Sequence, residues 1–154
     1  MKKNSLAKSK SVIGWREWVS LPELGIPRLK AKIDTGARTS ALHAFNVETY
    51  HHHGQLMVSF GIHPHQGRND DAILCSAKVH DKRIVTNSGG QRERRYVIIS
   101  RLRIGYFDWP IEFTLTNRDT MKFRMLLGRT GLGDKFLVEP DASYLFGKPG
   151  RHHP

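Results

Sequence analysis

Apolar and polar residues alternate over short stretches along most of the chain. Residues 12–19 are β-prone and partly alternating, and residues 29–33 alternate apolar side chains with lysines, as in a strand that buries one face. By the same criteria we predict further strands at residues 40–48, 55–60, 72–79, 83–86, 96–99, 101–106, 109–116, 125–127, 137–138 and 144–146. Turn signals separate many of these segments, most clearly at residues 21–27, 51–54 and 87–90.

Helical patterns are weak throughout the chain. The best candidate covers residues 129–136, and its two internal glycines predict a short helix. Many short strands with frequent turns and no internal repeat predict an all-β barrel or sandwich. We expect one domain over residues 12–147, between a flexible basic tail at 1–11 and a C-terminal tail at 148–154.

The composition supports one folded, basic domain. The chain has 154 residues, of which 38% are hydrophobic, enough for one packed core. Its 25 lysines and arginines outnumber its 14 aspartates and glutamates, giving a net charge of +11, so we expect an anionic partner. The single cysteine, Cys75, excludes an intramolecular disulfide and fits a reducing compartment. No apolar run approaches the roughly 20 residues that span a bilayer, so we expect a soluble, cytoplasmic protein without a membrane partner.

The strongest chemical signal is the sequence Asp34, Thr35 and Gly36 at the end of the predicted strand 29–33. A carboxylate at the end of an apolar strand is costly unless it is hydrogen-bonded or functional. Glycine lets the backbone turn sharply and approach a ligand closely. An aspartic protease presents these three residue types at a strand tip, but an ordinary Asx-type turn after a strand uses them too.

A second element lies far downstream, where an apolar triplet at residues 125–127 is followed by Gly128 and Arg129. Alone it predicts a buried strand that leads into a helix. Together the two elements resemble the retropepsin family of aspartic proteases, in which the apolar-Gly-Arg segment packs beneath the Asp-Thr-Gly loop.

Longer segments make the resemblance narrower: residues 13–18, 31–42, 115–119 and 125–130 resemble one bacterial branch of the retropepsin-like family. This branch carries the label ATP-dependent zinc protease, and its members commonly accompany ATP-grasp glutamate ligases. The similarity covers residues 12–145 and implies a retropepsin-like closed β-barrel, the acid protease fold, with one short C-terminal helix. It also implies a possible functional link to such a ligase.

The resemblance implies an aspartic endopeptidase that is active only as a homodimer, because the chain holds one Asp-Thr-Gly motif and has Asn87 before Ser88 and Gly89. Two Asp34 carboxylates would share a proton and activate one water molecule between them. The implied catalytic residues are Asp34, Thr35 and Gly36, with Thr35 holding the two loops together across the interface and Gly36 contacting the substrate backbone. The implied substrate-binding residues are Ala37, Arg38 and a glycine-rich flap at Ser88, Gly89 and Gly90, and the implied support of the active loop is Leu127, Gly128 and Arg129.

Two features depart from compact viral retropepsins. Gly128 follows Asp34 by 94 residues, which predicts extra structure within residues 47–82 and makes an ordinary surface hairpin an alternative to the flap. Many viral members also carry acidic residues after the alanine, one of which pairs with the arginine. Here Arg38 occupies this stretch, so Arg129 needs another partner.

Basic residues near the two motifs suggest an acidic substrate. Arg38, together with Arg92, Arg94 and Arg95 on the flap strand, would form a cationic cleft for a glutamate-rich peptide or a glutamate-tagged protein. The link with glutamate ligases points the same way. A solvated basic face is the alternative explanation for these arginines.

The alternatives to a peptidase are proteins that bind a metal, a nucleotide or a nucleic acid. Histidines cluster at residues 51–53 and 63–65, but the chain lacks a His-Glu-x-x-His motif, a second cysteine and a P-loop, so we expect no metal and no cofactor. Residues 82–103 contain seven basic residues and one acid, which suits a basic β-barrel module that binds nucleic acid or the ribosome without catalysis. A non-catalytic dimer that only recognises acidic tails is a third alternative.

Overall fold

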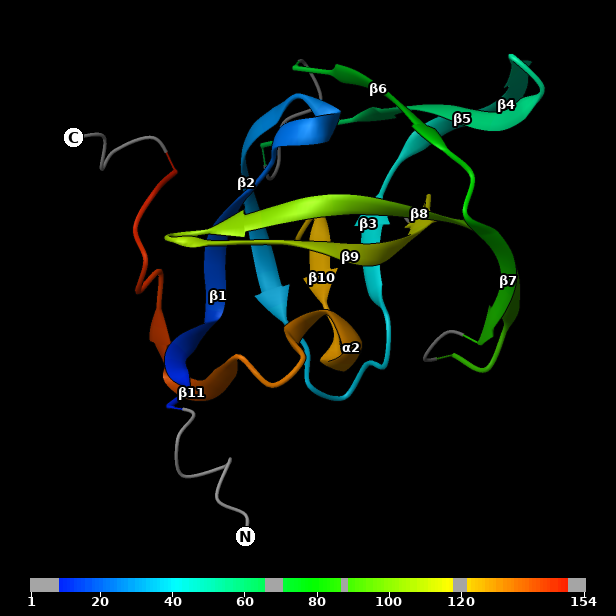
Figure 1. The fold of residues 1–154 in the computed structure, drawn as a ribbon. Helices are drawn as coiled ribbons and strands as arrows, with labels where there is room; N and C mark the ends of the chain where they lie inside the picture. Colours follow the sequence, from blue (N-terminus) through cyan, green and yellow to red (C-terminus); the bar gives the residue numbers. More distant parts are fainter. Residues whose placement is uncertain (1–8, 66–70, 87–88, 118–121, 150–154) are drawn as a thin grey trace, which may run out of the picture.

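The computed structural model describes residues 9–65, 71–86, 89–117 and 122–149. Eleven strands, one 3₁₀ helix and one short α-helix follow one another in this part of the chain (Figure 1). In chain order they are β1 (Ser11–Leu21), η1 (Pro22–Leu24), β2 (Ile26–Ile33), β3 (Ser40–His43), β4 (Phe45–His52), β5 (Gln55–Ile62), β6 (Ile73–Lys78), β7 (Asp81–Thr86), β8 (Arg92–Ile104), β9 (Phe107–Thr116), β10 (Met125–Leu127), α2 (Arg129–Leu132) and β11 (Phe136–Ser143).

Eight of these strands form one sheet that closes on itself. Its order is β11-β1-β2-β10-β3-β9-β8-β7, and a further antiparallel pairing of β1 with β8, at Ser20 and Arg103, closes the ring. Strands β4, β5 and β6 form a second, antiparallel sheet at the top of Figure 1. The prediction of an all-β, retropepsin-like barrel with one short helix is therefore confirmed.

Alternation along the strands builds the core. In β2, Leu29, Ala31 and Ile33 are buried, whereas the basic residues between them lie on the outer face. The central strands β3 and β10 contribute Leu42, Met125 and Leu127, all completely buried. This alternation is the sequence pattern expected of a sheet that has one face on a core.

The structure corrects the predicted strand at residues 40–48. It divides into β3 and β4 at Ala44, and Asn46, the second residue of β4, has a positive φ of 51°. A positive φ bends an extended chain, and asparagine adopts it more readily than most residues. The break directs the chain from the closed sheet into the second sheet, which holds much of the extra length expected within residues 47–82.

Other boundaries also differ from the predictions. The helix ends at Leu132 rather than 136, because Gly133 has a φ of 60° that leaves the helical region. The predicted strand at 144–146 is instead a turn, in which Tyr144 has a φ of 55° and its carbonyl accepts the Gly147 amide at 3.2 Å. The predicted strands at 96–99 and 101–106 join in the single long strand β8, which ends at Ile104. The turn before β9 falls at residues 105–106 rather than at 107–108.

The expected tails are only partly within the described ranges, since residues 1–8 and 150–154 lie outside them. Strand β1 begins at Ser11, one residue before the predicted domain boundary. None of the helices in the described ranges is long and apolar enough to cross a membrane.

A buried carboxylate fastens the C-terminal turn to β1. Glu17 is completely inaccessible to solvent, and its Oε2 accepts the amides of Gly14 at 2.7 Å and Leu145 at 3.1 Å. Its Oε1 accepts the Phe146 amide at 3.3 Å. Three amide donors take the place of water around this group, which is how a buried carboxylate is made tolerable.

Glu17→Gln should lower the free energy of unfolding by about 1–3 kcal/mol, because the new amide group would face a backbone donor without an acceptor. Urea unfolding measures this loss. Glu48→Gln, at an exposed position of β4, is the matched control and should change stability by less than about 0.5 kcal/mol. Equal stability of the two variants would contradict this role of Glu17.

Candidate active site

Asp34 lies in the loop between β2 and β3, at the lower end of the barrel in Figure 1. Its amide donates to the Leu127 carbonyl at 2.9 Å, and its carbonyl accepts the Ala37 amide at 3.2 Å. Its Oδ1 accepts the Gly36 amide at 3.1 Å, so the Asx turn weighed from the sequence is present. The carboxylate is half-buried and engages one of its two oxygens within the loop. It therefore reaches the surface in a fixed orientation.

The apolar segment 125–127 lies beside the strand that leads to Asp34. Strand β10 pairs in parallel with β2, so that Leu127 stands opposite Ile33, and antiparallel with β3, where Met125 stands opposite Leu42. Segments almost a hundred residues apart in sequence thereby hold the two ends of the Asp34 loop. The sequence resemblance implied this packing, and the structure has it.

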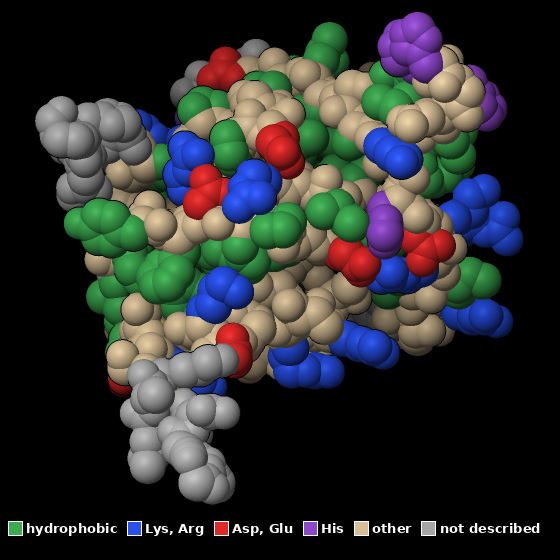
Figure 2. Space-filling view, viewed as in Figure 1, with side chains coloured by type: hydrophobic (Ala, Val, Ile, Leu, Met, Phe, Trp, Pro, Cys, Tyr) green, Lys and Arg blue, Asp and Glu red, His purple; other side chains and the backbone are tan. Residues whose placement is uncertain are grey.

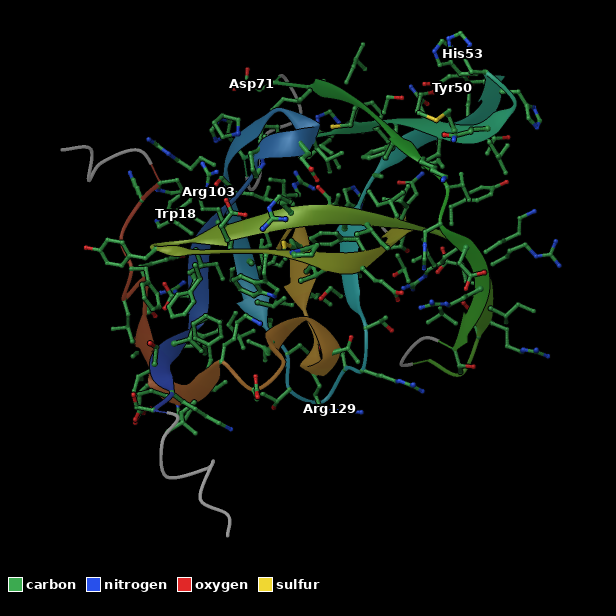
Figure 3. All side chains as sticks on the ribbon, viewed as in Figure 1. Trp18, Tyr50, His53, Asp71, Arg103 and Arg129 are labelled. Atoms are coloured by element: carbon green, nitrogen blue, oxygen red, sulfur yellow. The ribbon has the colours of Figure 1, made fainter. Side chains whose placement is uncertain are left out.

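Arg129 binds the loop from below. Its Nη1 donates to the carbonyl oxygens of Thr35 at 3.1 Å and Gly36 at 3.2 Å (labelled in Figure 3). Its own amide donates to the Ala37 carbonyl at 2.8 Å. The sequence did not identify a partner for Arg129, and the structure shows that this partner is the backbone of the Asp34 loop. A guanidinium can donate hydrogen bonds to both carbonyls, whereas a carboxylate could only accept them.

Thr130 adds to this clamp, although the sequence analysis did not single it out. Its amide and its hydroxyl both donate to the Arg38 carbonyl, at 3.0 and 2.8 Å. Ser40 was also missed, and its hydroxyl accepts the Gly128 amide at 3.0 Å. Both residues lie within the segments 31–42 and 125–130 that carry the family resemblance, so their position was the available signal.

Gly128 allows the two segments to approach closely. A Cβ at this position would lie 2.7 Å from the carbonyl carbon and oxygen of Thr39 and 3.0 Å from the Ala37 oxygen. All three atoms belong to the backbone of the loop, so they cannot move aside without opening it. Any side chain here would therefore push the two segments apart.

The predicted flap corresponds to the hairpin of β7 and β8. Thr86 and Arg92 form its last described pair, and the tip includes Gly89 and Gly90, whereas Ser88 lies outside the described residues. Gly90 has a φ of 84°, a conformation that favours glycine. In Figure 1 the hairpin bends toward the same end of the barrel as the Asp34 loop.

The proposed cationic cleft needs a correction at Arg95. This side chain is only 7% exposed and its guanidinium donates to Glu93 at 3.0 Å and to Thr114 Oγ1 at 3.2 Å. Its charge is paired inside the sheet, so it cannot line a cleft. Arg92 and Arg94, which alternate with it along β8, are exposed.

Arg95 instead belongs to a polar chain that joins the hairpin to the active loop. The Thr114 hydroxyl that accepts from Arg95 donates in turn to the Ser40 carbonyl at 3.3 Å. Ser40 is the residue whose hydroxyl holds Gly128. The arm of the hairpin and the base of the loop are thus parts of one hydrogen-bonded structure.

Other basic residues of segment 82–103 are neutralised as well. Arg83 pairs with Asp81 and with Glu112, both at 2.8 Å. Arg101 and Arg103 both pair with Asp108, at 2.6 and 2.8 Å. Figure 2 shows basic and acidic side chains interleaved on this face of the molecule. These pairs hold the pKa of Asp81, Asp108 and Glu112 below its usual range, because the guanidinium groups stabilise the carboxylates.

The two histidine clusters noted in the sequence lie away from the Asp34 loop. Residues 51–53 belong to the exposed β4–β5 hairpin, and Figure 3 labels His53 at the opposite end from Arg129. His63 stacks on Phe45, whereas His65 and His80 pair with Asp71 and Glu112. Among the described residues, no group of three or more potential ligands could hold a metal ion.

Comparison with known proteins places the chain in a family. A family model described as retropepsin-like aspartic endopeptidase RimB matches residues 12–149. The chain belongs to this RimB-like family.

Curated relatives of this RimB-like chain are much longer than the chain itself. It is 43% identical over 145 residues to a protein of Shewanella pealeana named "Probable alpha-L-glutamate ligase", covering 94% of this chain and 32% of that protein. A protein of the same name from Parasynechococcus marenigrum is 45% identical over 138 residues, or 90% of this chain and 30% of that one. The chain spans about a third of the length of these relatives.

A solved structure has the same fold. Protein Lpg0085 of Legionella pneumophila, described as of unknown function (DUF785), superimposes with a TM-score of 0.75 over 90% of this chain and 99% of that one. The two sequences are 24% identical, so the match supports the RimB-like fold alone.

Gly128→Ala should lower the free energy of unfolding by about 1–3 kcal/mol, because the new methyl group meets the backbone carbonyls of Thr39 and Ala37. Gly36→Ala is the matched control, since its nearest atom would be Asp34 Oδ1 at 3.4 Å, and it should cost less than about 0.5 kcal/mol. Chemical denaturation of both variants tests the contrast. Equal losses would show that the close approach at Gly128 does not hold the loop.

Proposed function

We propose that the protein is an aspartic endopeptidase of the retropepsin type, active as a homodimer in the cytoplasm. The main support for this proposal is the way in which hydrogen bonds hold the Asp34 loop. The 127–130 segment fastens it from below through backbone, Arg129 and Thr130 contacts, while the half-buried Asp34 carboxylate reaches the surface. A loop held this firmly suits a catalytic group that must keep its orientation.

One protomer supplies one such carboxylate, so the chemistry requires a second copy. Two-fold symmetry would bring the same loop from a partner opposite the first. The two Asp34 carboxyl groups would then share one proton, because two adjacent negative charges repel each other.

The proposed reaction is direct attack by water on a peptide bond. The charged Asp34 takes a proton from the water, whose oxygen bonds to the carbonyl carbon, and the protonated Asp34 donates to the carbonyl oxygen. The tetrahedral intermediate collapses when the C–N bond breaks and the leaving nitrogen receives a proton. The products are a carboxylic acid and an amine, without an acyl-enzyme.

The neighbours of Asp34 have corresponding roles in this proposal. Thr35 and Gly36 are exposed in the single protomer, and their carbonyls are held by Arg129. Thr35 would bond across the interface, and Gly36 would leave room for the substrate backbone. Ala37, Arg38 and the hairpin residues Ser88, Gly89 and Gly90 would contact the substrate.

We further propose that the substrate is acidic, as a glutamate-rich peptide or a glutamate-tagged protein. The chain carries a net charge of +11, which favours an anionic partner. It also matches about a third of the length of proteins that are named "Probable alpha-L-glutamate ligase". A peptidase beside a ligase could remove or shorten what the ligase adds. A functional link to a glutamate ligase follows from the same reasoning.

Nucleic-acid binding through segment 82–103 has less support. Four of its seven basic residues, Arg83, Arg95, Arg101 and Arg103, are paired with carboxylates of the chain itself. Cations that are already neutralised contribute little to binding of a phosphate backbone.

Asp34→Asn should reduce hydrolysis of a glutamate-rich peptide by about 10²–10⁴-fold or more, because the amide cannot take a proton from water. Cleavage of a labelled peptide measures this. Asp141→Asn, which alters an exposed aspartate of β11, is the control and should keep full activity.

The specific activity of the natural sequence should also fall on dilution below the dimer dissociation constant. Activity that persists in Asp34→Asn, or in a protein shown to be monomeric by sedimentation, would contradict the proposed chemistry.

A further inference from the structure

The outer face of β2 carries an uninterrupted row of cations that ends beside the active loop. Arg28, Lys30 and Lys32 alternate with the buried residues Leu29, Ala31 and Ile33, so all three lie on the outer face. We refer to these three residues as the β2 track. Lys32, at one end, is two residues before Asp34.

The neighbouring strand extends the positive charge of the β2 track. Residues directly opposite in antiparallel strands share a face, and Arg16 stands opposite Lys32 while Trp18 stands opposite Lys30. The one carboxylate within β1 and β2 is Glu17, which is buried in the interior. The outer face of this strand pair is therefore basic without an acid of its own.

Unlike the four paired arginines of β7 and β8, these cations have no carboxylate partner among the described residues. Within the described ranges, none of the ion pairs involves Arg16, Arg28, Lys30 or Lys32. Two of them lie against aromatic rings instead: Lys30 Nζ is 5.2 Å from the centre of the Trp18 ring, and Arg16 Cζ is 5.0 Å from that of Tyr144. A cation–π contact positions a cation without a carboxylate that neutralises its charge.

The far end of the β2 track opens into a cavity. This cavity has a volume of about 1100 Å³, and its lining includes Arg28, Arg103 and Lys148 beside the apolar Ile26 and Phe146. In Figure 1, β2 runs from the upper part of the barrel down to the Asp34 loop. The β2 track thus connects the cavity with the candidate active site.

We propose that the β2 track binds an acidic polypeptide whose scissile bond lies at Asp34. Same-face side chains of an extended peptide repeat about every 6.6 Å, the spacing at which the alternate residues of β2 repeat. Alternate glutamates of a chain lying along β2 therefore match Lys32, Lys30 and Arg28 in turn. This inference rests on the proposed function for its link to cleavage, but the binding itself does not.

The aromatic residues favour a polypeptide over single-stranded nucleic acid. Nucleic-acid sites on strands use exposed rings on which bases stack. Trp18 instead has Lys30 and Lys148 over its ring, at 5.2 and 5.4 Å, and Tyr144 packed beside it at 5.7 Å (Figure 3 labels Trp18). The ring therefore positions cations and is not free to stack on a base.

Binding of a fluorescein-labelled hexaglutamate peptide, measured by anisotropy, tests the proposal. The protein carries Asp34→Asn so that no cleavage occurs. Adding Lys30→Gln and Lys32→Gln should weaken binding roughly five- to tenfold at low salt, with the difference shrinking as salt rises. Lys78→Gln with Lys82→Gln removes the same charge from exposed positions on β6 and β7 and should change the affinity less than about twofold.

One further variant and one further ligand make the outcome decisive. Lys30→Arg with Lys32→Arg should restore hexaglutamate binding, which excludes a mere loss of folding. Equal weakening by the two glutamine pairs would overturn the proposal, since only net charge would then matter. Binding of a uridine decamer that depends on Lys30 and Lys32, without hexaglutamate binding, would also overturn it. If hexaglutamate binds as expected but the natural sequence cleaves nothing, the proposed peptidase fails while the binding surface stands.

Discussion

The structure depends on one backbone junction between segments far apart in sequence. The Asp34 amide bonds to Leu127, and the amides of Arg129 and Thr130 bond back to Ala37 and Arg38. Each such bond contributes only about 1 kcal/mol, but together they hold both sides of a short loop. The glycine at 128 makes the junction possible because a side chain there would strike Thr39. Arg129 then occupies the carbonyls of Thr35 and Gly36, which would otherwise face solvent.

Charge is divided between two faces of the barrel. On β7, β8 and β9, four arginines are paired with Asp81, Glu93, Asp108 and Glu112, so much of the positive charge there is compensated. On the outer face of β1 and β2, Arg16 and Lys30 lie over aromatic rings, and the one acid of these strands, Glu17, is buried. A net charge of +11 is therefore not spread evenly, and its uncompensated part includes the β2 track that leads to Asp34.

The sequence predicted those features that depend on local pattern. Alternation identified most strands, and the Asp34 and Gly128 motifs, with the segments around them, indicated the fold and the loop. Non-local features were not predictable in this way. Arg95 looked like a surface cation because Arg92 and Arg94 precede it, but β9 packs beside it and supplies Thr114, while Glu93 of its own strand pairs its charge. The partners of Arg129 are backbone carbonyls, which no residue pattern displays. The strand break at Ala44 and the positive φ of Asn46 just after it carry no strong local signal.

A crystal structure of the dimer tests the central claim most directly, through the distance between the two Asp34 carboxyl groups. If Asp34 is the catalytic residue, the two groups face each other across a two-fold axis about 3 Å apart, close enough to share a proton. A dimer in which the two Asp34 loops lie on separate surfaces, each exposed to solvent, would contradict it.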